Sequence, residues 1–183
     1  MSIYLLYSAL FLILGFGLAV AFLTGASVIA LFLVRVPFVP TPKKNVKMVI
    51  DALDLKPRNV FYDLGCGDGR FLIETEIRGA KAIGFEISAW AYGKAILNIW
   101  RHQSKAKVIF KNFYPININD ADAVFCFLLD SVMPKVETKL KKELKKGAKI
   151  VCYGFPLPSW PPKKIIETNP KDKKASKIYI YQK

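Results

Sequence analysis

Hydrophobic and polar residues divide the chain into two parts with different patterns. Residues 3–34 form one almost wholly apolar run, and no charged side chain occurs before position 35. A run of this length is typical of a membrane-spanning helix, which needs about 20 apolar residues. It is also much longer than the apolar core of a cleaved signal peptide, which has about 7–15 residues. We therefore expect a transmembrane anchor over residues 1–35, followed by a separate domain over residues 36–183.

In the second part, short apolar runs alternate with stretches in which apolar residues recur every three or four positions. This alternation predicts strands and helices in turn. The predicted helices are 44–53, 70–78, 88–102 and 131–146. The predicted strands are 60–64, 81–86, 107–111, 123–128 and 149–153, with a final pair at 164–167 and 177–181. The pattern favours an α/β fold with a mostly parallel sheet and helices on both faces, to which the final pair adds an antiparallel edge.

The charge is confined to the second part. The chain has 28 Lys and Arg against 14 Asp and Glu, a formal net charge of +14, and all of these residues follow the apolar run. Basic residues come directly after the run: Arg35, Lys43, Lys44 and Lys47. By the positive-inside tendency, this predicts a single-pass protein whose domain faces the cytoplasm and lies against the lipid bilayer. Small residues four apart in the run, Gly17 and Ala21, leave a homodimer through this helix open.

Composition also excludes several classes of function. In the predicted helix 131–146, apolar residues recur every four positions, so the lysines around them form a solvated face and no nucleic-acid partner is expected. His102 is the only histidine, and the three cysteines fall in or beside apolar runs. A metal site or a histidine-dependent hydrolase therefore has almost no residues from which to form.

The candidate chemistry begins where the predicted strand 60–64 ends. Asp63 is followed by glycines at 65, 67 and 69, which let the backbone turn sharply and approach a ligand closely. Glu86 lies 23 residues after Asp63, at the end of the next strand, where a carboxylate can accept hydrogen bonds from ribose hydroxyls. Arg70 stands where a dinucleotide-binding pattern needs glycine, which favours S-adenosylmethionine over NAD.

Other candidate residues follow from the geometry of open α/β sheets, in which ligands bind beyond the carboxyl ends of the strands. Asn112, Phe127 and Phe155 come at or just after such ends. Together with Asp63 and Glu86, they define one predicted edge of the sheet that carries the site.

The second part also resembles the membrane-anchored seven-strand protein-lysine methyltransferases, the group that includes the enzymes acting on ATP synthase subunit c and on the adenine nucleotide translocase. The resemblance rests on 37–41, 63–70, 84–86 with Trp90, the Lys139 to Leu144 helix, and 155–160. It implies a Rossmann-like methyltransferase sheet and S-adenosyl-L-methionine as cofactor. It also implies a membrane or membrane-proximal protein partner that carries the substrate lysine.

The resemblance further implies a role for individual residues. The cofactor-binding residues that it and the glycine loop suggest are Thr41, Asp63, Gly65, Cys66, Gly67, Asp68, Gly69, Glu86, Asn112 and Phe113. The substrate-binding candidates are Phe127, Asp130, Phe155, Pro156 and Trp160. Two departures from the family pattern stand out. Asn112 occupies the place of an aspartate, and Asp130 occupies that of a proline. Asp130 is therefore either a catalytic candidate or a helix cap, and Phe127 is a second catalytic candidate.

The predicted reaction is in-line methyl transfer to a deprotonated lysine amine, which needs no dedicated base. An apolar cleft lowers the pKa of the lysine, and fixed orientation supplies much of the remaining acceleration. Two alternatives stay open: methylation of a lipid amine or quinone, and a non-catalytic membrane tether that binds the cofactor.

Overall fold

The structure, a computed structural model, describes residues 3–33, 40–172 and 174–183. The chain divides into two units, residues 1–37 and residues 38–183, and each is described by itself. The first unit contains the helix α1 (Ile3–Leu33). Within α1, side chains are described at position 4, at positions 7–22 and at position 25.

Counted over the residues that the structure describes, no helix is both long and apolar enough to cross a membrane. This finding contradicts the predicted transmembrane anchor and the single-pass, cytoplasm-facing membrane location derived from it. The lipid bilayer as a partner and dimerisation through this helix both depended on that span.

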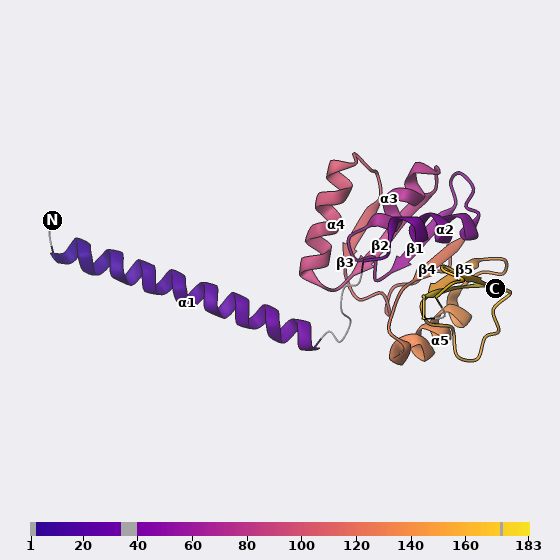
Figure 1. The fold of residues 1–183 in the computed structure, drawn as a ribbon. Helices are drawn as coiled ribbons and strands as arrows, with labels where there is room; N and C mark the ends of the chain where they lie inside the picture. Colours follow the sequence, from indigo (N-terminus) through magenta and orange to yellow (C-terminus); the bar gives the residue numbers. More distant parts are fainter. Residues whose placement is uncertain (1–2, 34–39, 173) are drawn as a thin grey trace. The chain divides into compact units, whose positions relative to one another are not determined.

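The second unit is built on one seven-stranded sheet, as the alternating pattern predicts (Figure 1). Its strands are β1 (Val60–Leu64), β2 (Lys81–Glu86), β3 (Lys107–Phe110), β4 (Ala123–Cys126), β5 (Lys149–Tyr153), β6 (Lys164–Glu167) and β7 (Lys177–Gln182). They are ordered β3-β2-β1-β4-β5-β7-β6. The first five are parallel, and β7 is antiparallel to both β5 and β6. The order reverses between β1 and β4, so the carboxyl ends of these strands form the topological switch point at which such sheets bind ligands.

Helices cover both faces of the sheet (Figure 1). They are α2 (Lys43–Leu53), α3 (Arg70–Ile77), α4 (Ala89–Arg101) and α5 (Met133–Glu143), with a short 3₁₀ turn, η1 (Asp130–Val132), before α5. Buried residues of α2 and α3 pack with Phe61 and Phe125 in one apolar core, to which Ile99 of α4 contributes. Residues of α5 pack with Leu64 and Ile150 in the other. The predicted fold class of the domain is thereby confirmed.

The structure corrects several predicted boundaries. The predicted helix 131–146 begins as the turn η1, with Pro134 in the first turn of α5, and ends at Glu143 because Leu144 has an extended backbone. This change of direction carries Lys145 toward Asp122, with which it forms an ion pair of 2.5 Å. The predicted strand 123–128 is shorter because β4 stops at Cys126.

Candidate functional site

The glycine loop after β1 has a backbone that only glycine adopts readily. Gly65, Gly67 and Gly69 have φ of 89°, 56° and 77°. The loop is held to β2, because the backbone N–H groups of Gly65 and Cys66 both donate to the carbonyl of Phe85, at 3.0 and 2.9 Å. The predicted loop therefore forms a rigid bend at the carboxyl edge of the sheet.

Glu86 organises this bend through backbone contacts that the sequence did not reveal. One carboxylate oxygen accepts from the N–H of Gly67 at 2.9 Å. The other accepts from the N–H groups of Ile87 and Ser88, both at 2.8 Å. A carboxylate has about four lone-pair positions, so acceptor capacity is left for a ribose hydroxyl. The contacts fix the orientation of Glu86 before any ligand binds.

Asp63 lies beneath the loop in an environment that disfavours its charge. It is only 1 % exposed, and neither of its carboxylate oxygens has a hydrogen-bond partner among the described residues. Burial raises the pKa of Asp63 well above its ordinary value, and the negative charges of Glu86 and Asp68 raise it further. A buried polar group without a partner is rare in folded proteins and asks for an explanation. The α-ammonium group of a bound amino acid moiety would supply one, so the residues here fit the methionine end of S-adenosylmethionine.

Asp68 has a clear structural role. Burial raises its pKa, but the hydrogen bonds and charge of Arg70 more than offset this, and the pKa of Asp68 is lowered. The two side chains form a bidentate pair, with nitrogen–oxygen distances of 2.8 and 2.6 Å. Arg70 also donates to the backbone carbonyl of Thr41, and Asn98 donates to the carbonyl of Asp68. Thr41 is thus brought to the glycine loop through Arg70, a link that needs the folded structure to be seen.

The predicted adenine contacts lie after β3. Asn112 accepts a hydrogen bond from the backbone N–H of Tyr114 at 3.0 Å through its side-chain oxygen. Phe113 is nearly buried and packs against the Tyr114 ring, with centroids 4.3 Å apart. Because β3 pairs with β2 in parallel, Asn112 and Phe113 leave the sheet at the same edge as Glu86.

The predicted acceptor side does not form one cluster. Phe127 packs in the core under α2 and α3 and meets the Tyr153 ring edge-on at 4.8 Å. Trp160 packs in the opposite core, 6.1 Å from the Tyr181 ring. Phe155 is partly exposed at 37 %. Asp130 is exposed at the start of η1, and no cap hydrogen bond from its side chain is recorded in the described part of the chain.

The segment that carries Phe155, Pro156 and Trp160 is tied down by residues that the sequence analysis missed. The hydroxyl of Tyr181 accepts from the N–H of Leu157 at 2.9 Å. The carboxylate of Glu137 accepts from both the backbone N–H and the hydroxyl of Ser159, at 2.9 and 2.5 Å. Glu137 also forms an ion pair with Lys141, one turn later in α5, at 2.5 Å, and its contact with Ser159 could not be read from helical spacing.

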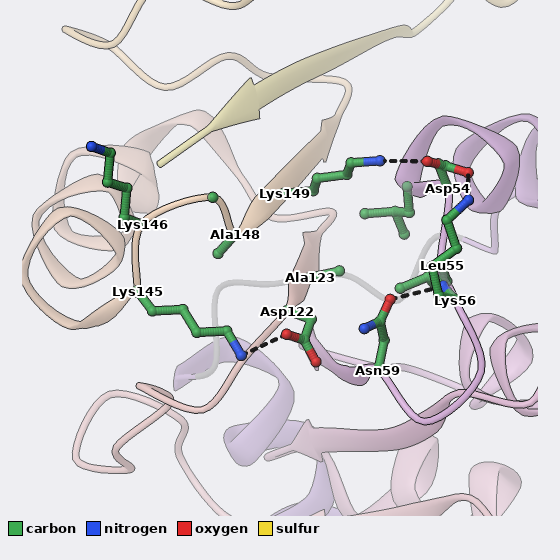
Figure 2. A pocket seen from close by; sticks show the side chains of 12 residues that line it. Asp54, Leu55, Lys56, Asn59, Asp122, Ala123, Lys145, Lys146, Ala148 and Lys149 are labelled. Carbon is green, nitrogen blue, oxygen red and sulfur yellow. Dashed lines mark hydrogen bonds and ion pairs between the residues drawn. The ribbon is translucent and has the colours of Figure 1, made fainter.

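A separate cavity of about 310 Å³ lies at the opposite edge of the sheet (Figure 2). It is lined by residues near the amino ends of β4 and β5, including Ala123 and Lys149. Lys149 forms an ion pair with Asp54 at 2.9 Å, and Lys145 forms one with Asp122. Among the described residues, no group of three or more His, Cys, Asp or Glu is arranged to hold a metal ion. The candidate cofactor site lies at the carboxyl edge, away from this cavity.

Comparison with known proteins identifies the family. Residues 63–164 match the family model of the ANTKMT methyltransferase domain. The chain belongs to this family. The match begins at Asp63 and extends just beyond Trp160, so it covers the glycine loop, Glu86 and the acceptor-side segment. Family membership confirms the predicted resemblance, apart from its membrane anchoring, and the methyltransferase class.

Two curated relatives and one solved structure are especially similar. A protein-lysine N-methyltransferase of Saccharolobus islandicus is 34% identical, over 80% of this chain and 93% of that protein. The adenine nucleotide translocase lysine N-methyltransferase of Mus musculus is 35% identical, over 72% of this chain but only 58% of its own length. An RNA methyltransferase from Salinibacter ruber, solved with S-adenosyl-L-homocysteine, superposes with a TM-score of 0.72 at 28% identity, covering 79% of this chain and 93% of that one. The predicted cofactor, S-adenosylmethionine, is confirmed by these comparisons.

Proposed function

We propose that this chain is an S-adenosylmethionine-dependent protein-lysine N-methyltransferase. The observation that carries the proposal is the match to the archaeal protein-lysine N-methyltransferase along 93% of that protein. The protein partner in this proposal needs only an accessible lysine, and no membrane location is included.

The residues of the carboxyl edge would hold the cofactor, which supplies an electrophilic methyl group on a sulfonium. Asp63 would pair with its α-ammonium group, and the bend from Gly65 to Gly69 would leave room for its amino acid part. Glu86 would accept from a ribose hydroxyl, and Asn112 with Phe113 would lie by the adenine. Thr41, fixed by Arg70, would close the pocket from the side of α2.

The acceptor lysine must lose its proton before it can attack. A lysine with a pKa near 10.4 is neutral in only about one molecule in a few thousand at pH 7. Phe127, Phe155 and Pro156 would line the acceptor cleft and desolvate the amine, which favours its neutral form, whereas Trp160 packs in the opposite core. Asp130 is exposed and could contact only the rim of this cleft, so it is proposed as a substrate contact rather than a base.

Transfer from radiolabelled cofactor to a cell extract tests the proposal. We expect label in protein, and acid hydrolysis of that protein should release labelled ε-N-methyllysine. Glu86→Ala should abolish the label, while Lys142→Met, at an exposed position of α5, should leave it unchanged. Label found only in the organic phase would assign a lipid amine or quinone substrate instead, and label only in RNA would assign the chemistry named for the Salinibacter ruber protein. Binding of the cofactor without transfer to any fraction would refute the proposal and indicate a domain that binds the cofactor without catalysis.

A further inference from the structure

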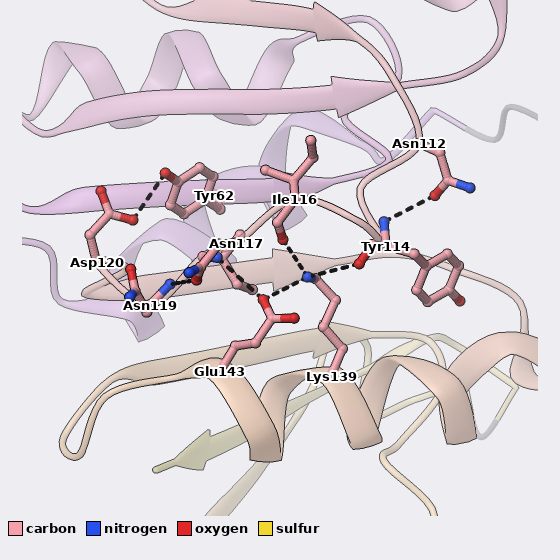
Figure 3. A network of polar contacts seen from close by, with 10 residues as sticks. Tyr62, Asn112, Tyr114, Ile116, Asn117, Asn119, Asp120, Lys139 and Glu143 are labelled. Atoms are coloured by element: carbon pink, nitrogen blue, oxygen red, sulfur yellow. Dashed lines mark hydrogen bonds and ion pairs between the residues drawn. The ribbon is translucent and has the colours of Figure 1, made fainter.

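A buried lysine on α5 holds the loop that follows β3 (Figure 3). Lys139 is 6 % exposed, although a lysine side chain is almost never buried unless it is paired. Its Nζ donates to the carbonyl of Tyr114 at 3.2 Å, to the carbonyl of Ile116 at 2.5 Å, and to the carboxylate of Glu143 at 2.6 Å. The three acceptors match the three N–H groups of an ammonium.

The loop that Lys139 contacts, residues 111–122, has no regular secondary structure of its own. Loops of this length without secondary structure are uncommon in compact domains and are often functional. Its far end is held by Asp120, which accepts from the Tyr62 hydroxyl at 3.0 Å, and by Lys145. The part of the loop closer to β3 is held from α5 instead, by Lys139 and Glu143. Glu143 also accepts from the N–H of Ile118 at 3.3 Å.

Two successive hydrogen bonds link Lys139 to Asn112, a candidate cofactor-binding residue. Lys139 fixes the carbonyl of Tyr114, and the N–H of Tyr114 donates to the side-chain oxygen of Asn112. With that oxygen engaged, the NH₂ of Asn112 is the end of the amide that faces away from this turn. An NH₂ group donates hydrogen bonds, so it suits a ring nitrogen that accepts one.

We infer that Lys139, together with Glu143, is a positioning residue that sets Asn112 for recognition of the adenine ring of the cofactor. The inference rests on the proposed function, because it takes the loop after β3 as the adenine side of the site. N1 of adenine accepts a hydrogen bond, whereas N1 of hypoxanthine carries a hydrogen and donates one. A correctly placed Asn112 amide therefore discriminates between the two bases, and a misplaced one does not.

Calorimetry with S-adenosylhomocysteine and with its inosine analogue, S-inosylhomocysteine, tests the inference. The full-length chain should bind the adenine compound at least tenfold more tightly than the hypoxanthine compound. Lys139→Met should weaken binding of the adenine compound about tenfold and reduce the ratio between the two compounds to below about threefold. At saturating cofactor its kcat and its KM for the protein substrate should stay within about twofold of those of the wild type.

Controls separate positioning from a general loss of structure. Lys142→Met removes a lysine from the exposed side of the same helix and should change neither affinity nor the ratio. Lys139→Arg keeps a charged donor beside Glu143 and should restore part of the discrimination. If Lys139→Met does not fold, Glu143→Gln gives the test, because it removes one charge of the pair and should lower the ratio to an intermediate value.

A folded Lys139→Met protein with an unchanged base ratio would overturn the inference, and so would an unchanged ratio in Glu143→Gln. Failure of the wild type to bind S-adenosylhomocysteine would instead refute the proposed cofactor site. Normal binding by the wild type, with a base ratio that falls in Lys139→Met but without methyl-lysine formation, would refute the proposed substrate while supporting the role of Lys139.

Discussion

Asp63→Asn should stabilise the ligand-free domain and weaken cofactor binding. Asp63 lies on β1 between Gly84 of β2 and Phe125 of β4, and it is buried without a hydrogen-bond partner among the described residues. Asparagine has nearly the same shape but no charge. The substitution therefore changes the electrostatics of the site and leaves the packing of the strand intact.

The sign of the stability change follows from the direction of the pKa shift. Burial, Glu86 and Asp68 raise the pKa of Asp63 in the folded state above its unfolded value. The folded state then binds more protons than the unfolded state, so stability falls as the pH rises from about 4 toward the folded pKa. Each pH unit in that window costs about 1.4 kcal/mol. Asp63→Asn removes this loss, so it should unfold at a higher Tm than the wild type at pH 7, by a margin that narrows as the pH is lowered toward 4.

The effect on binding has the opposite sign. A hydrogen bond to a charged group contributes about 1.5–3 kcal/mol, so loss of the carboxylate should weaken S-adenosylhomocysteine binding about 10- to 100-fold. Because an ionised Asp63 is the form that pairs with an ammonium, wild-type affinity should rise with pH below the folded pKa and that of Asp63→Asn should not.

Thermal unfolding between pH 5 and 8 and calorimetry with S-adenosylhomocysteine measure both effects. Asp172→Asn, in an exposed turn near the C-terminus, provides a matched control and should change neither quantity. An Asp63→Asn variant that melts below the wild type at pH 7, or that binds the ligand equally well, would refute the reasoning.

Four further predictions concern two glycines, Glu86 and the buried cysteines. Gly84→Ala would bring its Cβ within 2.6 Å of neighbouring side-chain atoms and should destabilise the domain by about 1–3 kcal/mol in urea unfolding. Gly93→Ala lies on α4, where a Cβ would meet nothing within 4 Å, and should stabilise the domain by about 0.5–1 kcal/mol in the same assay. Glu86→Gln turns an amide NH₂ toward a backbone donor and should weaken S-adenosylhomocysteine binding about tenfold by calorimetry. Cys126 and Cys152 are fully buried with sulfurs 3.3 Å apart, and burial raises the pKa of Cys152, so a thiol reagent at pH 8 should titrate both only after denaturation.

The sheet and its helices could be predicted because their periodicities are local. A strand such as β1 is a short apolar run, and α5 shows a four-residue apolar repeat whose members, such as Val136 and Leu140, are fully buried. The ends of elements depended on longer-range contacts. Leu144 continues the apolar repeat, yet its backbone is extended and the helix ends at Glu143, after which Lys145 forms its ion pair with Asp122.

The residues of the site also fall into those that local spacing predicts and those that depend on contacts between distant segments. The positions of Asp63, the glycines and Glu86 follow from strand ends and spacing, both of which can be read along the chain. The contacts that fix the site join distant segments: Arg70 with Thr41, Glu137 with Ser159. Periodicity carries no information on such pairs, so a lysine such as Lys139 was assigned to a solvated face although it points into the fold.

Three carboxylates lie at the carboxyl edge of the sheet, and their hydrogen-bond partners determine which of them is available to a positively charged ligand. Asp68 is paired with Arg70, and Glu86 accepts from three backbone N–H groups. Both are therefore already compensated in the folded protein, and their contacts stabilise the loop. Asp63 has no such compensation among the described residues, and its charge is opposed by the other two. Proteins retain a destabilising group of this kind where function needs it, so Asp63 is the residue at which ligand binding and folding stability should oppose each other.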